Sequence, residues 1–246
     1  MRRIIALAML AAFAALAAGC FNPFDPRVSD TRVTSSPAPT PSSPANTVRL
    51  FAWCWQHRDP LTYKQVFTDD YRFIFAQNDS AGNAFRDRPW LREDEMDMAT
   101  HLFTGGADRP PASDVSITID NLLLALPDPR PGHLNKWHTT VTTGVDLKVT
   151  VTSSDGTPSV TPVTGRALFY LVRGDSAALP SDLAGLKPDS TRWWIERWED
   201  ETVSNGPGSA FRAPRPGARP TPGGPYELPP LTFGELKKAY WASSSY

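Results

Sequence analysis

Apolar side chains recur at helical spacing near residue 50 of the chain. Val48, Phe51 and Trp55 lie three or four positions apart, so they share one face of a helix. The preceding Ser43-Pro44 pair combines a residue that caps helix N-termini with one that is favoured at the first helical position. This pattern predicts a helix from about residue 44 to His57.

The pattern then changes from helical periodicity to runs of branched and aromatic residues, which are typical of strands. Asp59-Pro60 repeats the helix-start signal, and Gly105-Gly106 ends a longer helical segment. Helices that precede consecutive strands predict an α+β fold, in which three N-terminal helices pack on a strongly curved antiparallel sheet. The predicted elements after the first helix are a helix at 60–66, a strand at 70–75, a polar loop at 77–89, a helix from 90 or 91 to 103, and strands at 115–126, 137–152, 160–173 and 192–200.

Two proline-rich segments flank this region. The first has prolines among Ser, Thr and Ala and too few apolar side chains to form a core, so we expect it to be disordered. The second combines proline with arginine and is expected to be disordered as well. Beyond it, Phe233, Leu236 and Tyr240 lie at helical spacing. The expected organisation is a tether at 20–45, a folded domain at 46–203, a Pro/Arg-rich arm at 204–230 and a short C-terminal helix or tail at 231–246.

The first twenty residues combine a basic start, an apolar run and small residues. After the Arg2-Arg3 pair, the apolar run is too short for a membrane-spanning helix with polar flanks, which predicts an export signal. Leu16-Ala17-Ala18-Gly19-Cys20 resembles the lipobox of bacterial lipoprotein signals. The resemblance implies removal of residues 1–19 and acylation of Cys20, which anchors the protein to a membrane of the bacterial cell envelope. Phe21 stands where inner-membrane lipoproteins commonly carry Asp, so the outer membrane is favoured. An ordinary secretory signal is the alternative.

Charge and cysteine content narrow the classes of function. The chain has 25 basic and 26 acidic residues, and removal of residues 1–19 leaves 23 basic residues and a net charge of −3 (23 − 26). This balance argues against nucleic-acid binding and against a polybasic membrane surface, so the lipid is the expected membrane contact. Cys54 is then the remaining cysteine, and its apolar neighbours predict a buried, inert thiol.

The order of elements and two sequence motifs resemble a known superfamily. Trp55-Gln56-His57-Arg58-Asp59, followed by Tyr63 and Phe67-Thr68-Asp69-Asp70-Tyr71, is similar to the opening run of the nuclear-transport-factor-2-like superfamily, which includes SnoaL-like cyclases and ketosteroid isomerase. Arg192-Trp193-Trp194-Ile195-Glu196-Arg197-Trp198 resembles its closing strand. The resemblance covers about residues 46–201 and implies a cone-shaped fold around one deep apolar pocket. It implies no particular reaction and no cofactor, because this fold hosts enzymes, scaffolds and binding modules.

Aromatic and titratable residues on the predicted strands and the third helix are the candidates for lining such a pocket. If the pocket is catalytic, His101, Asp70 and Glu196 supply the acid–base groups. Simpler interpretations exist, because aromatic side chains on a covered sheet fill the core and a histidine on a buried seam is usually hydrogen-bonded. The candidate ligand-binding residues are Tyr71, Phe73, His101, Tyr170, Trp194 and Glu196.

The last predicted strand places two large aromatic side chains and a carboxylate on one face. Strict alternation places Trp194, Glu196 and Trp198 on one side of it. A buried Glu196 needs a cation, such as Arg166, Arg173 or another, because otherwise its pKa rises.

The third predicted helix carries a cluster of residues that are able to bind a metal. Acidic residues in the first turn of a helix also complement its dipole by roughly 0.3–1 kcal/mol each, and this is the simpler interpretation. We therefore expect no metal at this helix. The clustered residues are Glu93, Asp94, Glu95, Asp97 and His101.

Three hypotheses of function are open at this point. The first is a lipid-anchored envelope protein whose pocketed domain binds a small apolar ligand or a protein partner without catalysis. The alternative is an acid–base isomerase, cyclase or dehydratase of the SnoaL-like kind. The third is a structural role, in which the domain forms a homodimer through its open sheet face and the Pro/Arg-rich arm docks on an envelope partner. The sequence contains no phosphate-binding loop, nucleophile elbow or dinucleotide fingerprint, which disfavours the common hydrolases and cofactor enzymes.

Overall fold

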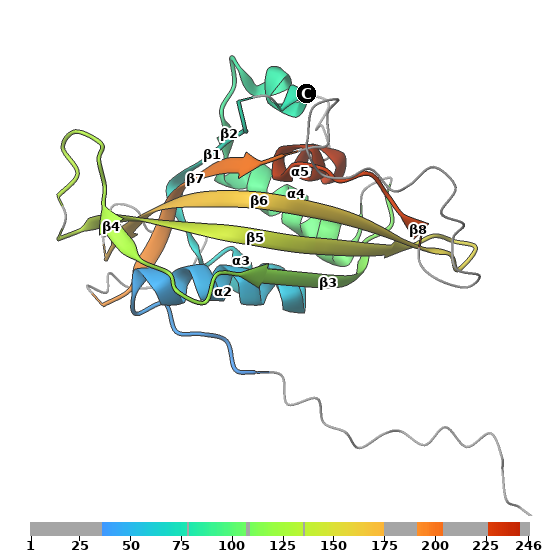
Figure 1. Ribbon diagram of the computed structural model, residues 1–246, viewed down its shortest axis with the longest axis horizontal. Helices are drawn as coiled ribbons and strands as arrows, with labels where there is room; N and C mark the ends of the chain where they lie inside the picture. Colours follow the sequence, from blue (N-terminus) through green and yellow to red (C-terminus); the bar gives the residue numbers. More distant parts are fainter. Residues whose placement is uncertain are drawn as a thin grey trace, which may run out of the picture. The chain divides into compact units, whose positions relative to one another are not determined.

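A long, curved sheet with helices packed against it makes up the described part of the chain (Figure 1). The computed structural model describes residues 36–241, apart from 78, 107–108, 135, 175–190 and 204–225. The predicted export signal, Cys20 and most of both proline-rich segments lie outside the described residues. The helices are α2 (Pro44–His57), α3 (Pro60–Tyr63), α4 (Arg92–Thr104), α5 (Phe233–Tyr240) and the 3₁₀ helix η1 (Ser80–Phe85). The strands are β1 (Phe67–Ile74), β2 (Trp90–Leu91), β3 (Ala112–Ile119), β4 (Ala125–Pro127), β5 (His138–Thr152), β6 (Pro158–Arg173), β7 (Trp193–Thr202) and β8 (Tyr226–Glu227).

The strands follow one another across the sheet in the order β2-β1-β7-β6-β5-β3, while β4 pairs with β5 and β8 pairs with β6. Most neighbours are antiparallel, whereas β1–β7 and β6–β8 are parallel pairs. The long strands β5 and β6 remain paired over their whole length and run side by side across the domain in Figure 1. This arrangement confirms the predicted α+β class, with a strongly curved and mostly antiparallel sheet that carries helices.

The helix-start motifs act as the sequence predicts. Ser43 Oγ accepts a hydrogen bond from Asn46 N at 3.2 Å, and Pro44 occupies the first turn of α2. The helix ends at Arg58, whose φ of 50° lies in the left-handed region. Asp59 then caps α3 through its side chain. Local capping chemistry therefore sets these two helices.

Pairing with the sheet changes the limits of several predicted elements. Residues 90–91 pair with β1 as β2, so the third predicted helix begins at Arg92. The predicted strand at 115–126 is divided into β3 and β4, which pair with different parts of β5. The predicted polar loop at 77–89 contains η1. These differences arise because backbone hydrogen bonds to distant segments decide where each element ends.

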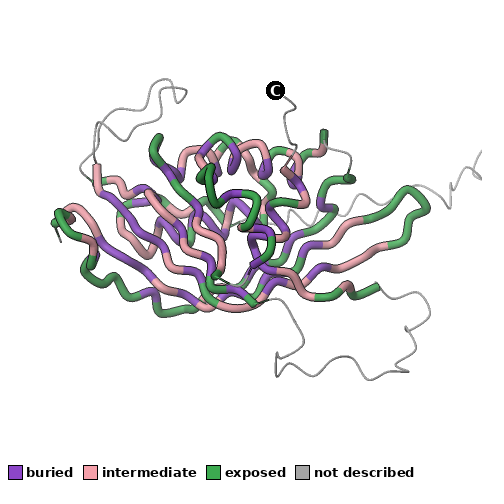
Figure 2. The backbone as a smooth tube through the Cα atoms, turned by 90° about the horizontal axis from the view of Figure 1, so that it is seen from above, coloured by how far each residue is buried: buried purple, intermediate pink, exposed green. Residues whose placement is uncertain are grey.

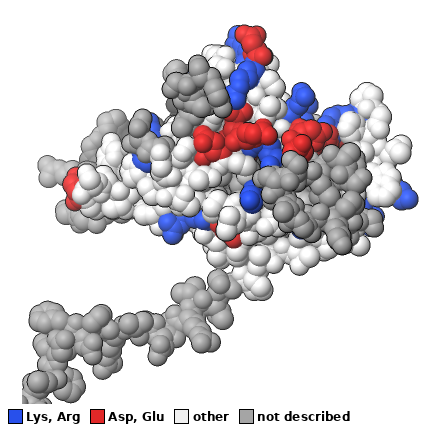
Figure 3. Space-filling model, turned by 180° about the vertical axis from the view of Figure 1, so that it is seen from behind, with Lys and Arg blue, Asp and Glu red and all other residues white. Residues whose placement is uncertain are grey.

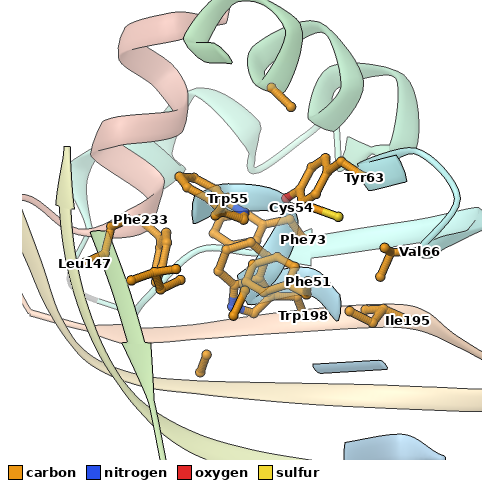
Figure 4. Close-up of a cluster of buried hydrophobic side chains, with 14 of the residues drawn as sticks. Phe51, Cys54, Trp55, Tyr63, Val66, Phe73, Leu147, Ile195, Trp198 and Phe233 are labelled. Carbon is orange, nitrogen blue, oxygen red and sulfur yellow. The ribbon is translucent and has the colours of Figure 1, made fainter. Parts of the chain in front are cut away.

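The C-terminal helix α5 packs into the same core as the sheet (Figure 4). Phe233 and Lys237 have no exposed surface, and the Phe233 ring centroid lies 4.7 Å from that of Trp198. At the other end of the chain, Pro41 accepts a hydrogen bond from Trp193 N. The folded unit therefore extends beyond the limits of 46 and 203 expected from composition, because tertiary contacts also hold residues just outside them. Strand β8 likewise lies within the arm that was expected to be disordered.

Two buried acidic residues hold the N-terminus of α5. Asp200 Oδ2 accepts a hydrogen bond from Gly234 N at 3.1 Å, and Asp79 Oδ2 accepts one from Thr232 Oγ1 at 2.6 Å. A Cβ atom at position 234 would overlap Asp79 Oδ2, so glycine is required for this approach. Carboxylates at a helix N-terminus are also favoured by the helix dipole. Polar contacts thus add to the apolar packing that attaches α5 to the sheet.

Aromatic rings fill much of the space between the helices and the sheet. Figure 4 shows Phe51 and Trp55 of α2 beside Trp198 of β7, and the ring centroids of Phe51 and Trp198 are 5.0 Å apart. Buried and more exposed positions alternate along the long strands, as expected for a sheet with one covered face (Figure 2). Cys54 is buried in this core as predicted, and burial raises the pKa of its thiol well above the usual value.

Candidate functional site

A β-bulge in β7 decides which side chains face the core. Tyr170 pairs with Arg197, and the next pair along the two strands skips Glu196, which is the extra residue of the bulge. Trp198 lies in the core with no exposed surface, whereas Glu196 lines a cleft. The predicted common face of Trp194, Glu196 and Trp198 is therefore wrong for Trp198, because the bulge interrupts strict alternation.

Charged side chains surround this cleft, which has a volume of about 230 Å³. Arg72 lies between Tyr71 and Phe73, which are both buried in the core, so alternation directs Arg72 to the face opposite the helices. The cleft therefore opens on the outer face of the sheet. Its lining residues are Asp70 and Arg72 from β1, Arg130 from the β4–β5 connection, and Glu196 and Arg197 from β7.

Arg130 organises one wall of the cleft. Its Nη2 donates to Asp128 Oδ2 at 2.6 Å and to Glu196 Oε2 at 2.9 Å, and its Nε bonds to Asp128 as well. Burial raises the pKa of Asp128, but the hydrogen bonds from Arg130 outweigh burial and lower the pKa overall, which keeps Asp128 ionised. The cation that Glu196 requires is thus Arg130, rather than Arg166 or Arg173.

The other three lining residues carry charges that are less completely paired. Arg197 Nη2 donates to Glu199 Oε1 at 2.6 Å, but Arg197 Nε is buried and has no hydrogen-bond partner among the described residues. Asp70 and Arg72 are exposed, and neither forms an ion pair with another described residue. A buried donor without a partner costs about 1–3 kcal/mol, which an acceptor atom of a ligand offsets.

Two histidines lie beside Glu196. His133 Nε2 is 3.8 Å from Glu196 Oε1, and the His133 and His138 ring centroids are 4.6 Å apart. One nitrogen of each histidine and one oxygen of Glu196 all lie within 4.8 Å of one another. His133 belongs to the β4–β5 connection and His138 to the first position of β5, so the bulge in β7 brings its carboxylate to both of them.

The interior holds a second polar cluster, centred on Glu95 of α4. Its carboxylate accepts hydrogen bonds from Tyr63 Oη at 2.7 Å, Tyr71 Oη at 3.3 Å and Trp90 Nε1 at 2.9 Å, and it pairs with Lys237 of α5. Neither side chain of the ion pair has exposed surface. Burial lowers the pKa of Lys237 to about 8, although Glu95 acts in the opposite direction. Burial, and then Glu95, raises the pKa of both tyrosines, which keeps them as hydroxyl donors.

The residues predicted to line one pocket lie in several places. His101 Nδ1 is 3.2 Å from Tyr240 O and 3.5 Å from Asp97 Oδ2, and His101 does not line the cleft. The cleft therefore brings together two of the three predicted acid–base residues, Asp70 and Glu196. Tyr71 and Phe73 lie in the core, and His101 lies against α5. Asp70 and Glu196 line the cleft, and Tyr170 lies at its rim. Trp194 lies under the Arg192 guanidinium.

The acidic cluster of the third predicted helix is divided in the structure. Glu95 points to the interior, while Asp94 accepts hydrogen bonds from Leu91 N and from Arg88. Consecutive helical positions point in different directions, so these carboxylates serve separate partners.

Sequence reasoning did not identify the residues that make up most of the cleft and the interior cluster. Arg130 and His133 lie between the predicted strands at 115–126 and 137–152, and Lys237 lies in the predicted C-terminal helix or tail. The signal that the sequence does contain is the density of charged and histidine residues in 128–138. Their partners lie far along the chain, which a local pattern does not show.

No family model and no curated protein matches the chain. Among solved structures, it is similar to a conserved protein from Planctomyces limnophilus, with 14% identity over 65% of this chain and 92% of the other, at a TM-score of 0.40. The Kfla4162 protein from Kribbella flavida shares 12% identity over 63% and 84% of the two chains, at a TM-score of 0.42. A ketosteroid isomerase-like protein from Erwinia carotovora atroseptica shares 13% identity over 63% and 89%, at a TM-score of 0.37. These similarities assign no activity to the chain.

Acidic and basic side chains are mixed on the surface seen from behind, and basic side chains form no continuous field there (Figure 3). This distribution agrees with the near-neutral composition. Among the described residues, no helix is long and apolar enough to cross a membrane.

Proposed function

We propose that the protein is a lipid-anchored binding protein of the bacterial cell envelope, whose charged cleft holds a small polar ligand without catalysis. The observation that carries this proposal is the difference between the interior and the cleft. Inside, Glu95 has no exposed surface and accepts three neutral donors in addition to pairing with Lys237. Its acceptor capacity is used within the protein, which leaves no place for it to act on a substrate.

The charges of the cleft indicate which charged groups a ligand would carry. Arg130 and Arg197 are paired with acidic neighbours, whereas Asp70 and Arg72 stay outside these pairs. A molecule with both an ammonium and a carboxylate group matches this exposed pair of opposite charges. The volume of about 230 Å³ lies below the roughly 300–1,000 Å³ of drug-sized pockets, which favours an occupant of amino-acid or dipeptide size. Because all five lining side chains are charged, a small apolar ligand fits this cleft poorly.

The proposed location rests on the N-terminal sequence. The lipobox-like motif ending at Cys20 supports acylation, and Phe21 supports the outer membrane. In this proposal the acyl chains are the membrane contact, and an envelope partner or homodimer through the sheet face stays a prediction.

A ligand screen with matched variants tests the cleft. The purified protein is titrated calorimetrically with free amino acids and dipeptides, and with a panel of hydrophobic metabolites for comparison. We expect a polar compound to bind, and Arg72→Ala to weaken it at least tenfold, because Arg72 supplies a charge that no described residue pairs. Arg166→Ala is the control, since Arg166 is exposed, pairs with Glu201 and does not line the cleft.

Two results would contradict the proposal. Binding of an apolar compound that is unaffected by Arg72→Ala would place the ligand elsewhere. Turnover of a bound compound that is lost in both Asp70→Asn and Glu196→Gln would favour the acid–base enzyme instead.

A further inference from the structure

We infer that His133, His138 and Glu196 form a binding site for a divalent transition metal of the zinc class. The site goes beyond the proposed function and does not depend on it, because metal binding is measured without any organic ligand. Two imidazoles and one carboxylate make up a donor set that zinc prefers, and a set of three protein ligands is typical of sites that keep a fourth position for water or a ligand.

The distances between the three ligand atoms are close to those of a metal site. The three ligand atoms lie within 4.8 Å of one another, and His133 Nε2 is 3.8 Å from Glu196 Oε1. With zinc–ligand distances of about 2.0–2.2 Å and tetrahedral angles, neighbouring ligand atoms are roughly 3.4 Å apart. Movements of about 1 Å therefore bring all three onto one ion, which side chains that are only half-buried allow.

The hydrogen bonding of the two rings supports a metal. His133 Nδ1 lies 3.2 Å from Pro131 O, and a carbonyl oxygen accepts only, so Nδ1 carries a proton. In the neutral ring, Nε2 then carries a lone pair that faces the Glu196 carboxylate. Two acceptors therefore face each other, and a cation between them can bind both. Metal-binding histidines commonly donate their other N–H to a backbone carbonyl in this way. His138 Nδ1 is buried and has no hydrogen-bond partner among the described residues, so the histidine pair also holds a ring nitrogen that lacks a partner.

The neighbouring arginine orients the carboxylate without cancelling its charge. Arg130 binds Glu196 through Oε2 and leaves Oε1 toward His133. Asp128 has no exposed side-chain surface and bonds to the same guanidinium, so it compensates the charge of Arg130. Glu196 therefore keeps a negative charge for the metal, and Arg130 acts as an outer partner that fixes its direction.

Metal titrations of the full chain test this inference. The purified, chelator-stripped protein in detergent is titrated with Zn²⁺ in competition with a fluorescent chelator, and with Co²⁺, whose visible absorption reports four-coordinate sites. We expect one Zn²⁺ per chain, and at least tenfold weaker binding in each of His133→Ala, His138→Ala and Glu196→Gln. Glu196→Gln keeps an oxygen acceptor for Arg130 and removes the charge, so it tests the ligand role even if a histidine variant folds poorly. His57→Ala is the matched control and should bind within twofold of the parent, because His57 contacts Trp53 at the end of α2.

Each outcome decides the inference. Loss of the Co²⁺ absorption in the three variants, with circular dichroism unchanged in at least Glu196→Gln, supports it. Absence of saturable Zn²⁺ binding overturns it. Zn²⁺ binding that all three variants retain also overturns it, because the metal then binds elsewhere on the chain.

Discussion

Glu95 and Lys237 show how a single buried contact between residues connects the two ends of the fold. The ion pair has no exposed surface, and Lys237 Nζ lies 4.0 Å from the ring centroid of Trp198. Desolvation of two charges is expensive, and the attraction between them repays it only when further hydrogen bonds satisfy both groups. Tyr63 and Trp90 provide such bonds to Glu95. The space between the helices and the sheet around Glu95 is therefore occupied by a polar network of the protein itself.

Removal of one member of this pair is the sharpest test at the residue scale. We expect Lys237→Met to lower the free energy of unfolding by about 3–5 kcal/mol, because Glu95 is left as an uncompensated buried charge. The double variant Lys237→Met/Glu95→Gln should lose less, since it removes both charges. Guanidinium denaturation at pH 7 measures both values. A single variant within 1 kcal/mol of the parent would mean that the pair is not buried as described.

At the scale of elements, α5 depends on the acids that hold its first turn. Asp200 accepts hydrogen bonds from Thr202 and from Gly234 N, and it lies near Asp79. Burial raises the pKa of Asp200 from 3.8 to about 6, although the hydrogen bonds act in the opposite direction. Docking of the helix is therefore linked to protonation of a carboxylate on β7.

The pH dependence of stability follows from this shift. Between pH 4 and 6 the folded state binds more protons at Asp200 than the unfolded state, so stability falls as pH rises through this window. A shift of about two units corresponds to roughly 3 kcal/mol, which is present below pH 4 and lost above pH 6. We expect Asp200→Asn to flatten the fall in unfolding free energy between pH 4.5 and 7.5, measured by urea denaturation. Parallel pH profiles for parent and variant would show that Asp200 is not the linked group.

At the scale of the whole molecule, the sheet separates two environments. One face is covered by α2, α4 and α5 and filled with aromatic rings, while the other carries the charged cleft and the histidine pair. Because the covered face is packed with side chains, recognition on the outer face agrees better with the structure than binding between the helices and the sheet.

The lipid anchor is tested by labelling in cells. We expect Cys20→Ser to abolish incorporation of labelled fatty acid and to release the protein from the membrane fraction, because the thiol is the proposed acylation site. Cys54→Ala is the matched control and should still be labelled, since Cys54 is buried in the core. If the Cys20→Ser protein takes up as much label as the parent, the lipoprotein hypothesis is wrong.

Local physics in the sequence determined much of the secondary structure. Ser43-Pro44 and Asp59-Pro60 start helices by capping, and the long branched runs form β5, β6 and β7, because these signals act between residues a few positions apart. The order of elements was enough to predict the α+β class. The helical spacing of Phe233, Leu236 and Tyr240 predicted a short C-terminal helix or tail at 231–246, but not what such a helix contacts.

Only the tertiary structure decided the sites. Arg130 and Glu196 are 66 positions apart, and Glu95 and Lys237 are 142 apart, so no local pattern links them. The bulge at Glu196 depends on the register between β6 and β7, and a shift of one residue reverses the face of every side chain beyond it. Burial of Lys237 depends on the docking of α5, which Gly234 and the two acids at its N-terminus allow. The sequence thus determined which elements form, whereas long-range pairing decided which charged groups meet.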